Sequence, residues 1–573
     1  MKNKEIAMLF NKIADILEFK GDVSFRINSY RKAAHIIEDM AEDIEAYDES
    51  GTLKEIEGIG ESLAKKIDEY IKTGRIAKYE EMKTGVSEEL IDLMKISGIG
   101  QKTLALIHKK YGVKNIDELE KVVTDGKVRD LFGMGDKKAE NILRGIKLYR
   151  ASHGRISLGI AFPVMRMIID ELKKNRKVKK IDIAGSLRRM QETIGDIDIL
   201  VCGKEGKDIV NHFTTLPCVK EVLSSGSTRG SVVVEDGIQV DVRVVREDSY
   251  GAALQYFTGS KEHSVKLRGI AKAHGYKINE YGIYKGDKKV GGAHESDIYS
   301  ALGLAYIPPV LRENRGEIEA ASRNMLPSLV QSKNVRGDLH VHSNWSDGES
   351  SVEDVVRASI ELGYEYVAIC DHSQSLKVAH GLSPETVFRK LDEIKRVRKK
   401  YKDFAILFGT EVDIKSDGSI DYSDTVLKEF DVVIGAVHTG FKDSEEKLTS
   451  RILSAINNKY VNIIAHPTGR RIGLREPYPV DLDAIFKAAS QSGTFLEINS
   501  FYDRLDLCDT AVKRAKEYGV KFALSTDCHH VDQLWMMSLG VSVAQRGWLT
   551  KNDVVNCWPL PKLLSHFSSK NKK

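Results

Sequence analysis

The chain has 573 residues, of which 42% are hydrophobic and 30% are charged, so folded cores rather than disorder are expected. At roughly 100–200 residues per domain, this length predicts about three to five domains. The 87 basic and 83 acidic residues nearly balance, so any surface that binds nucleic acid must be local. No stretch approaches about 18 apolar residues, and we expect no membrane-spanning helix.

The cysteines and the first residues of the chain favour a cytoplasmic protein. The six cysteines lie at positions 202, 218, 370, 508, 528 and 557 and form no C-x-x-C pair, so neither a disulfide framework nor a cysteine-based zinc site is expected. Reduced thiols suit the cytosol. The N-terminal segment lacks the apolar run of a signal peptide, and Leu9, Ile13 and Ile16 share one face of a predicted amphipathic helix.

Residues 1–150 have apolar residues at spacings of three and four, which predicts helices. A pattern of apolar-x-Gly-apolar-Gly occurs at residues 56–60, 96–100 and 131–135, each time before a predicted helix. Paired glycines allow a tight turn with positive φ, and the start of the next helix presents free backbone N–H groups to a phosphate. One such turn is usually an ordinary connection, whereas three favour DNA binding. The pattern resembles the helix-hairpin-helix element, which holds the DNA backbone without reading sequence. Its candidate DNA contacts are Gly58, Gly60, Gly98, Gly100, Gly133 and Gly135.

After residue 155 the sequence alternates between helices and strands, and three acids lie on predicted strands. Asp196 and Asp198 are two residues apart, so their side chains should face the same way, and Asp241 lies in another strand. Clustered carboxylates repel one another unless a cation lies among them, and oxygen ligands suit Mg²⁺ bound together with substrate phosphates. Two ions could hold the attacking and leaving oxygens of an in-line displacement. A lone D-x-D pair is most often a solvated strand face, so the third acid and the Gly-Ser pair that precedes the acids decide the interpretation.

Gly185 and Ser186 follow a predicted strand and precede a basic helical start. Their backbone N–H groups and the serine hydroxyl could hold the outer phosphates of a triphosphate, which Arg189 could neutralise further. The spacing GS-x(8)-GDID, which ends with Gly195 and the acid pair, is the signature of the nucleotidyltransferase palm of DNA polymerase beta. The chain therefore resembles family X DNA polymerases over residues 1–310.

The resemblance continues through residues 256–260, which are similar to the turn of that family that contacts the sugar and base. It implies stacking under the sugar by Tyr256 and Phe257, close approach at Gly259, and a position near the templating base for Arg268. Ser264 departs from the family, which usually has an asparagine there at the minor-groove edge of the base. The departure implies weaker nucleotide binding or discrimination, with the chemistry retained.

Residues 28–33 and the first hairpin resemble the small N-terminal domain of the same family. That domain often carries a deoxyribose-phosphate lyase, in which a lysine forms a Schiff base. Lys66 falls on the matching position and Lys78 on a supporting one, but Ser62 replaces another supporting lysine. A lyase and an ordinary solvated lysine both stay open.

After residue 337, strands and helices alternate, which predicts a barrel-like β/α domain. Acids and histidines lie near the C-terminal ends of its apolar strands, where a parallel barrel gathers its active-site loops. Tetrahedral zinc takes about four ligands, so a larger set predicts two or three ions, and mixed nitrogen and oxygen donors suit Zn²⁺, Mn²⁺ or Fe²⁺. Such ions acidify a bound water for attack on a phosphodiester. The candidate ligands are His340, His342, Asp347, His372, Glu411, His438, His466, Asp527 and His529.

This ordered set resembles the polymerase-and-histidinol-phosphatase (PHP) family over residues 336–570. A PHP domain behind a family X polymerase is typical of bacteria and some archaea, and implies a metal-dependent 3′–5′ exonuclease, often with AP endonuclease or 3′-phosphatase action. Cys528 could add a sulfur near the metals or fill the core, and His380 and His530 are candidate substrate contacts.

We expect a multidomain α/β chain with an α+β palm and thumb and a distorted β/α barrel. The expected domains are a helical lyase-like domain with a helix-hairpin-helix (1–80), a second helix-hairpin-helix domain of the fingers type (81–150), the palm (151–247), the thumb (248–315), a linker (316–335) and the PHP domain (336–570). The final residues, SSKNKK, are expected to be disordered.

The leading hypothesis is a template-directed DNA polymerase that fills short gaps during repair, using dNTPs and two Mg²⁺ or Mn²⁺ ions, while the PHP site removes mispaired or blocked 3′ ends. Its partners would be gapped or nicked duplex DNA, and we expect a monomer. A template-independent nucleotidyltransferase stays open. So does a DNA-binding scaffold whose PHP domain acts on a small phosphate ester. A merely structural PHP domain is disfavoured because all nine ligands are present.

Overall fold

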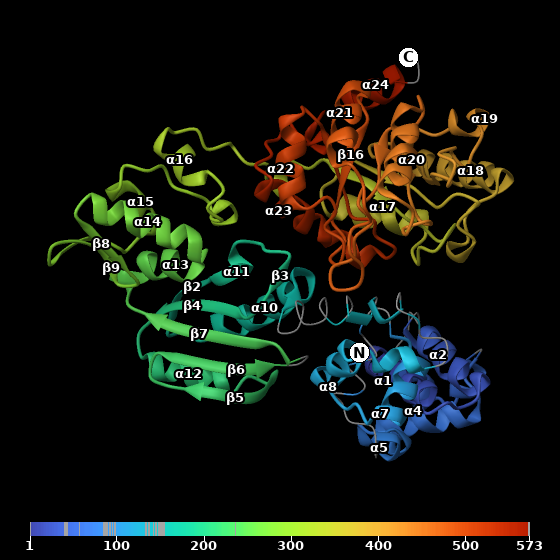
Figure 1. Ribbon diagram of the computed structural model, residues 1–573, viewed down its shortest axis with the longest axis horizontal. Helices are drawn as coiled ribbons and strands as arrows, with labels where there is room; N and C mark the ends of the chain where they lie inside the picture. Colours follow the sequence, from blue (N-terminus) through green and yellow to red (C-terminus); the bar gives the residue numbers. More distant parts are fainter. Residues whose placement is uncertain are drawn as a thin grey trace. The chain divides into compact units, whose positions relative to one another are not determined.

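A computed structural model of the chain describes residues 2–38, 44–56, 58–83, 90, 93, 96, 99–131, 135, 138–140, 142, 143, 146, 155–234 and 237–570. They belong to two compact units, Met1–His153 and Gly154–Lys573 (Figure 1). Within the described ranges, every helix is too short or too polar to span a bilayer.

The first unit is helical, as predicted. The amphipathic N-terminal helix is confirmed, with Ile13 and Ile16 fully buried, and Phe10 meets Tyr30 edge-on at 5.4 Å between ring centroids. Residues 6–82 and residues 90–146 each supply the bulk of a separate hydrophobic core. The helices of the first core are α1 (Lys2–Phe19), α2 (Ser24–Glu38), α3 (Ile44–Glu49), η1 (Leu53–Glu55), α4 (Glu61–Thr73) and α5 (Ala77–Lys83). Those of the second are α7 (Gln101–Tyr111), α8 (Ile116–Thr124) and η3 (Lys127–Asp130).

Helices α4 and α7 begin directly after Gly60 and Gly100, as the hairpin pattern predicted. Among the hairpin glycines that the structure describes, a positive φ occurs at the first glycine of the first hairpin. Gly58 has φ +91°, whereas Gly60 and Gly100 are extended with φ −78° at the helix N-caps. A Cβ at Gly58 would approach Ile36 Cδ1 to 2.4 Å, so the tight packing there requires glycine. Gly98 and Gly133 lie outside the described residues, and Gly135 is exposed.

The second unit begins with a mixed sheet in the order β2-β4-β7-β6-β5, against which α10 and α12 pack. Strands β4 and β7 are parallel neighbours, with Asp198 opposite Asp241. The elements are β1 (Ile156–Ser157), α10 (Leu158–Lys173), β2 (Val178–Ile183), α11 (Gly185–Arg188), β3 (Thr193–Ile194), β4 (Ile197–Gly203), α12 (Gly206–Thr214), β5 (Val219–Ser225), β6 (Arg229–Val234) and β7 (Gln239–Val245).

A smaller α+β layer follows the palm sheet. Its three strands lie in the order β10-β9-β8, and its buried residues form one core with the segment up to residue 321. The elements are η5 (Glu247–Ser249), α13 (Tyr250–Thr258), α14 (Lys261–Ala273), β8 (Tyr276–Asn279), β9 (Gly282–Lys285), β10 (Lys288–Gly291) and α15 (Glu295–Ala301).

The segment predicted to be a polar linker is folded, which corrects that expectation. It contains α16 (Glu317–Ser322) and η7 (Ser332–Asn334), and η6 (Pro309–Leu311) precedes it. The fully buried Glu317 lies 2.7 Å from His263 Nδ1 and accepts hydrogen bonds from the backbone N–H groups of Asn314 and Arg315. A pairing across 54 residues leaves no trace in local sequence composition.

The predicted barrel is confirmed as seven parallel strands in consecutive order. A parallel bridge between Val341 and Cys528 joins the first strand to the segment that follows the last. Helices cover its outside, as Figure 1 shows around β16. The strands are β11 (Gly337–Val341), β12 (Tyr366–Ile369), β13 (Ala405–Asp413), β14 (Val432–Ala436), β15 (Ile463–Ile464), β16 (Phe495–Asn499) and β17 (Phe522–Ser525). The helices are α17 (Val352–Glu361), α18 (Pro384–Lys400), α19 (Asp424–Leu427), α20 (Glu445–Asn457), α21 (Leu482–Ser492), α22 (Asp509–Glu517), α23 (Met537–Arg546) and α24 (Leu560–Lys570), with short turns η8 (Lys377–Ala379), η9 (Val531–Met536) and η10 (Val555–Cys557).

The predicted disorder of the last residues is wrong for the part that the structure describes. Helix α24 continues to Lys570, whose buried ammonium donates to the carbonyls of Ile456 and Asn458, both at 3.1 Å, and of Val461. These acceptors lie just at and beyond the end of α20, where backbone carbonyls lack helical partners. Residues 571–573 lie outside the described residues.

One hydrophobic cluster runs from the palm into the barrel. It contains Leu158 and Ile168 of α10 together with barrel residues such as Leu534. Phe162 stacks on Trp535 with ring centroids 6.1 Å apart, and a Cβ at Gly159 would lie 2.2 Å from Tyr502 Cβ. The palm and the barrel therefore share a core rather than a solvated contact.

Candidate functional site

The three palm acids lie together at one end of the parallel pair β4–β7. An oxygen from each of Asp196, Asp198 and Asp241 lies within 4.8 Å of the other two. Asp198 and Asp241 are on the strands, whereas Asp196 directly precedes β4 rather than lying on it as predicted. Neighbouring parallel strands in register thus bring together residues 43 positions apart in the sequence.

The electrostatics of this cluster fit a cation. Burial, followed by repulsion from Asp196 and Asp241, raises the pKa of Asp198 to about 7. Burial and the charge of Asp241 also raise the pKa of Asp196. Asp241 Oδ1 is buried without a hydrogen-bond partner, while its Oδ2 accepts from Gln239 Nε2 at 2.9 Å. Divalent cations that bind oxygen would relieve both the repulsion and the unpaired oxygen.

Gly185 packs directly on Asp198. It has φ +61°, and a Cβ there would lie 2.2 Å from Asp198 Oδ2, so any side chain would displace the acid. Ser186 follows in the single turn of α11, and Gly195 lies between β3 and β4. The predicted phosphate-binding segment therefore lies beside the acids.

Arg189 has protein partners that the sequence did not predict. Its Nε donates to Glu313 Oε1 at 2.8 Å and its Nη1 donates to the Thr258 carbonyl at 2.6 Å. Its side chain is 13% exposed, as is that of Glu313. The guanidinium thus has a fixed orientation.

The cavity beside the acids has further basic residues that the sequence analysis missed. Its volume is about 140 Å³, and Arg229 and Arg243 line it together with Phe257. Arg243 lies over the Phe257 ring at 4.5 Å. Arg243 follows Asp241 by two residues on β7, so strand alternation could have placed both on one face.

The predicted sugar-contacting aromatics end helix α13 rather than forming part of the turn, and Gly259 follows with φ +70°. Tyr256 and Phe257 meet edge-on at 5.2 Å, and Arg268 lies over Tyr256 at 6.0 Å. Ser264 Oγ, on α14, is buried without a hydrogen-bond partner. An unpaired hydroxyl at the position of the family's asparagine leaves one donor available to a ligand.

The barrel brings all of its predicted ligands together at the C-terminal ends of the strands. Three overlapping sets each have donor atoms within 4.8 Å of one another, and they share His342 and His372. His466 joins them through Nε2, 3.0 Å from Glu411 Oε1. The sets are His342, Asp347, His372 and His529; His340, His342 and Asp527; and His372, Glu411 and His438.

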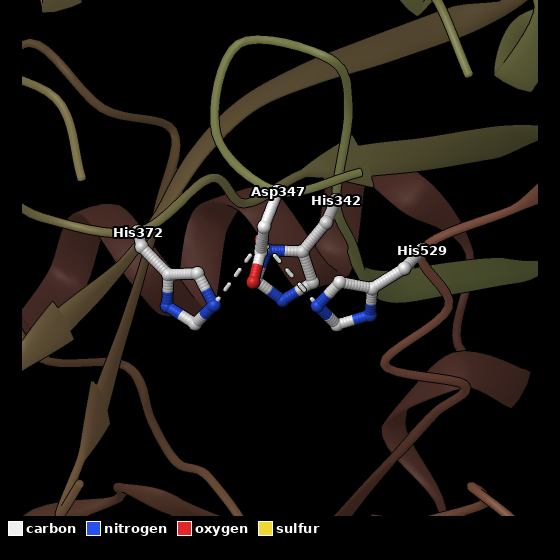
Figure 2. Close-up of side chains that lie close together, drawn as sticks. All are labelled: His342, Asp347, His372 and His529. Carbon is white, nitrogen blue, oxygen red and sulfur yellow. Dashed lines mark ion pairs between the residues drawn. The ribbon is translucent and has the colours of Figure 1, made fainter. Parts of the chain in front are cut away.

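Figure 2 shows the first of these sets. The rings of His372 and His529 point toward Asp347 from opposite sides, with Nε2 atoms 3.5 Å and 3.4 Å from Asp347 Oδ1. His342 Nδ1 lies 3.9 Å from the same oxygen. Donors that surround one point in this way suit an ion held by nitrogen and oxygen.

Unpaired buried atoms support metal binding in the barrel. His372 Nδ1 and Glu411 Oε2 are 2.8 Å apart, yet neither has a partner in hydrogen-bonding geometry. His342 Nδ1 and His466 Nδ1 are likewise buried and unpaired. Atoms that converge without bonding one another are the arrangement expected of ligands for a shared ion.

The barrel acids and imidazoles perturb one another strongly. Burial, reinforced by His529 and His372, lowers the pKa of His342 to about 4. Burial opposes protonation of His372, yet Glu411 and Asp347 raise its pKa to about 10. Burial alone would raise the pKa of Glu411, but His438, His372 and His340 hold it well below its usual range. Such opposed shifts are typical of functional sites.

Residues behind the ligands fix their orientation, and the sequence analysis missed them. Glu497 Oε1 lies 2.8 Å from His340 Nδ1, and Glu497 Oε2 accepts from the His466 backbone N–H at 2.6 Å. Asn499 Nδ2 donates to Glu497 at 3.1 Å and to Asp527 at 3.0 Å. Partners of this kind hold the ring and tautomer of a ligating histidine. Asn499 is the last residue of β16 and Glu497 lies two residues before it, close to the strand-end position that identified the other ligands.

The comparisons with known proteins agree with this geometry. The chain matches a helix-hairpin-helix domain over residues 1–76, a SAM-like helix-hairpin-helix tandem over 90–147, the DNA polymerase beta thumb over 253–313 and the PHP domain over 338–501. It is 37% identical to the DNA polymerase/3'-5' exonuclease PolX of Bacillus subtilis (strain 168), over 97% of each chain. The chain belongs to the family X DNA polymerases that carry a PHP domain. The chain is also 30% identical to a probable phosphatase of Thermoanaerobacter sp. (strain X514), over 41% of this chain and 96% of that protein.

Three candidate residues of the PHP domain lie apart from the ligand sets found among the described residues. Cys528 is buried within the hydrophobic core, which favours the packing interpretation of this thiol. His380 is exposed, with φ +54°, and His530 Nδ1 accepts from the Asp532 backbone N–H at 3.2 Å. Within the described part of the chain, neither histidine forms a side-chain hydrogen bond or ion pair with the ligands, so their role as substrate contacts stays a prediction.

The family's lyase position lies in an open cavity of about 1460 Å³ in the first unit. Lys66 Nζ donates to the Ser62 carbonyl and hydroxyl, both at 2.9 Å, and lies 5.9 Å from the Tyr30 ring. Burial, with help from Lys78 and Arg26, lowers the pKa of Lys66. A lowered pKa increases the fraction of neutral amine that a Schiff base requires.

Proposed function

We propose that this chain is a template-directed DNA polymerase that fills short gaps during repair, and that its barrel is a metal-dependent 3′–5′ exonuclease. The observation that carries the proposal is the presence of both acid-rich centres, each intact, in one chain that aligns with a polymerase/exonuclease over 97% of its length. The proposed substrates are gapped or nicked duplex DNA and dNTPs, and the proposed form is a cytoplasmic monomer.

In the proposed polymerase site, Asp196, Asp198 and Asp241 would hold two Mg²⁺ or Mn²⁺ ions, which when bound stabilise the developing charge of an in-line displacement. The primer 3′-hydroxyl attacks the α-phosphate of the dNTP and pyrophosphate leaves. Ser186 and Arg189 would bind the outer phosphates.

The nucleoside would lie against the end of α13. Tyr256 and Phe257 would support the sugar there, and Ser264 Oγ would face the base edge. Arg243, held over Phe257, would add positive charge beside the acids.

In the proposed exonuclease site, the nine barrel ligands would hold two or three Zn²⁺, Mn²⁺ or Fe²⁺ ions, which when bound supply an acidified water for phosphodiester hydrolysis. Glu497 and Asn499 would keep His340, His466 and Asp527 in place. AP endonuclease and 3′-phosphatase action would use the same centre on other 3′ or abasic ends.

The test uses a 5′-labelled primer on a duplex with a one-nucleotide gap, with Mg²⁺ or Mn²⁺, in the presence and absence of dNTPs. Template-directed extension with dNTPs and stepwise 3′ shortening without them are expected. Extension that ignores the template would support the template-independent alternative. Failure of both reactions, with hydrolysis of a small phosphate ester, would support the scaffold alternative.

A lyase is a second candidate activity of the N-terminal unit, because Lys66 is half-buried in an open cavity and its pKa is lowered. Borohydride should trap the chain covalently on duplex DNA with a 5′-deoxyribose phosphate. Lys66→Ala should abolish trapping, whereas Lys65→Ala, an exposed neighbour on α4, should retain it. Equal trapping by both variants would exclude Lys66 as the nucleophile.

A further inference from the structure

An arginine of the exonuclease barrel is bonded into the polymerase site. Arg546, the last residue of α23, is 4% exposed. Its Nη1 donates to the backbone carbonyl of Arg189 at 2.9 Å and lies 3.2 Å from Glu313 Oε1. Glu313 is also the carboxylate that accepts from Arg189 Nε at 2.8 Å. A barrel residue therefore holds both the main chain of Arg189 and the counter-ion of its side chain.

The other side of Arg546 is anchored within the barrel. Its Nη2 donates to Asp509 Oδ2, on α22, at 2.5 Å. The same carboxylate accepts from Arg315 Nη1 at 2.8 Å. Gln191 also donates to Glu313. The resulting row alternates in charge, with Glu313 between Arg189 and Arg546, and Asp509 between Arg546 and Arg315.

The charges in this row bear on what Arg189 can bind. A single Glu313 paired with Arg189 alone would neutralise it, since a close carboxylate cancels most of the field of one guanidinium. Arg546 shares that carboxylate, so the two guanidinium groups of Arg189 and Arg546 face the single negative charge of Glu313. Buried charge-assisted hydrogen bonds also fix geometry more strictly than exposed ones. Arg189 is thus both oriented and left able to attract an anion.

We propose that Arg546 is a positioning residue of the polymerase reaction, which sets Arg189 for the triphosphate of the incoming dNTP from within the exonuclease barrel. The inference rests on the proposed role of Arg189. It predicts that nucleotide binding depends on the docked barrel but not on the barrel's metal ligands.

The experiment compares full-length Arg546→Met with Arg315→Met. The control loses an ion pair to the same Asp509 but touches neither Glu313 nor Arg189. For each protein, KM and kcat for dNTP are measured on a duplex with a one-nucleotide gap, and the affinity for Mg²⁺–dNTP is measured by calorimetry. The rate of 3′ shortening and the Tm are also measured. Arg546→Met should raise KM and the dNTP dissociation constant roughly tenfold, as expected for loss of hydrogen bonds to charged groups. Its shortening rate should stay within about twofold, and Arg315→Met should change KM by less than about twofold.

A double-mutant cycle separates this inference from the role of Arg189 itself. Arg189→Met should raise KM on its own, and adding Arg546→Met to it should raise KM little further, because Arg546 acts through Arg189. If Arg189→Met leaves KM unchanged, the proposed phosphate role fails, whatever Arg546 does. If Arg546→Met raises KM equally with and without Arg189, the positioning inference is overturned.

Three other results would also overturn it. These are an unchanged KM in Arg546→Met, an equal rise in Arg315→Met, and a parallel loss of extension and shortening with a lowered Tm. Should Arg546→Met fold poorly, Arg546→Lys keeps the charge but loses the fork, in which Nη1 contacts Glu313 and the Arg189 carbonyl while Nη2 contacts Asp509. It should raise KM about threefold, and a wild-type KM in that variant would contradict the inference.

Discussion

The palm and the barrel gather carboxylates in opposite surroundings. Asp196, Asp198 and Asp241 are each partly exposed and offer only oxygen, whereas His340 and Glu411 are buried in a cluster that interleaves imidazoles with acids. Partly exposed oxygen donors suit ions that arrive with substrate phosphates, and buried mixed donors suit ions that stay with the protein. The difference predicts that ions at the palm would be shared with the substrate, whereas ions at the barrel would stay with the protein.

The largest expected effect tests whether the two centres are independent. Asp198→Asn removes a charge at the core of the palm cluster and should lower extension about a thousandfold or more while sparing 3′ shortening. His340→Ala should do the reverse. Single-turnover extension and shortening of one labelled primer measure both rates. Loss of both activities in either folded variant would show that the two centres are not independent.

Removal of free metal is expected to have the next largest effect, and it should lower the activity of the palm more than that of the barrel. After gel filtration into buffer without metal, extension should fall more than about a hundredfold, because the palm ions are expected to exchange with solvent. Shortening should persist, because most of the barrel donors are buried. Metal analysis of the filtered protein should find two or three ions per chain. Equal loss of both activities would show that the barrel ions exchange as freely as those of the palm.

A smaller effect on 3′ shortening is expected from changes to the residues that orient the barrel ligands. Glu497→Gln keeps the shape but weakens the contacts to His340 and the His466 backbone, and should lower 3′ shortening about 10–100-fold. Extension should be unaffected. A matched change, Glu385→Gln, removes an exposed carboxylate at the start of α18 and should leave both rates unchanged. Wild-type shortening in Glu497→Gln would show that the orienting contact is dispensable.

The smallest effect concerns the nucleotide end of the palm site. Ser264→Asn restores the side chain usual in the family and should lower KM for dNTP by a few-fold, roughly the gain from one hydrogen bond. Steady-state extension of a one-nucleotide gap measures it. An unchanged or higher KM would indicate that the surroundings of Ser264 leave no room for a longer side chain.

The sequence predicted the barrel strands and the convergence of the nine candidate ligands at one end of the barrel, because parallel strands direct their C-terminal ends to the same face. It also predicted the palm acids, since D-x-D alternation is a local property. Glu497 and Asn499 also lie near the C-terminal end of a barrel strand, so the same argument could have predicted them as residues of the site.

The features that the sequence did not predict are contacts between residues that lie far apart in the sequence. The pairing of Arg189 with Glu313, the burial of Glu317 beside His263 and the anchoring of Lys570 each join residues far apart in the sequence. Neither composition nor periodicity reports such pairings. The polar residues of the two segments around Glu317 and Lys570 therefore predict a linker and a disordered tail, although both segments are folded.

The shared core of palm and barrel restricts how the chain can be divided. Excising either half would expose Phe162 or Trp535, and with them the apolar face of α10, to water. A fragment cut between residues 315 and 337 should therefore aggregate more readily than the intact chain. For a lineage that carries this chain, losing the nuclease by gene truncation would first damage the solubility of the polymerase, which is a structural reason for the fusion to persist.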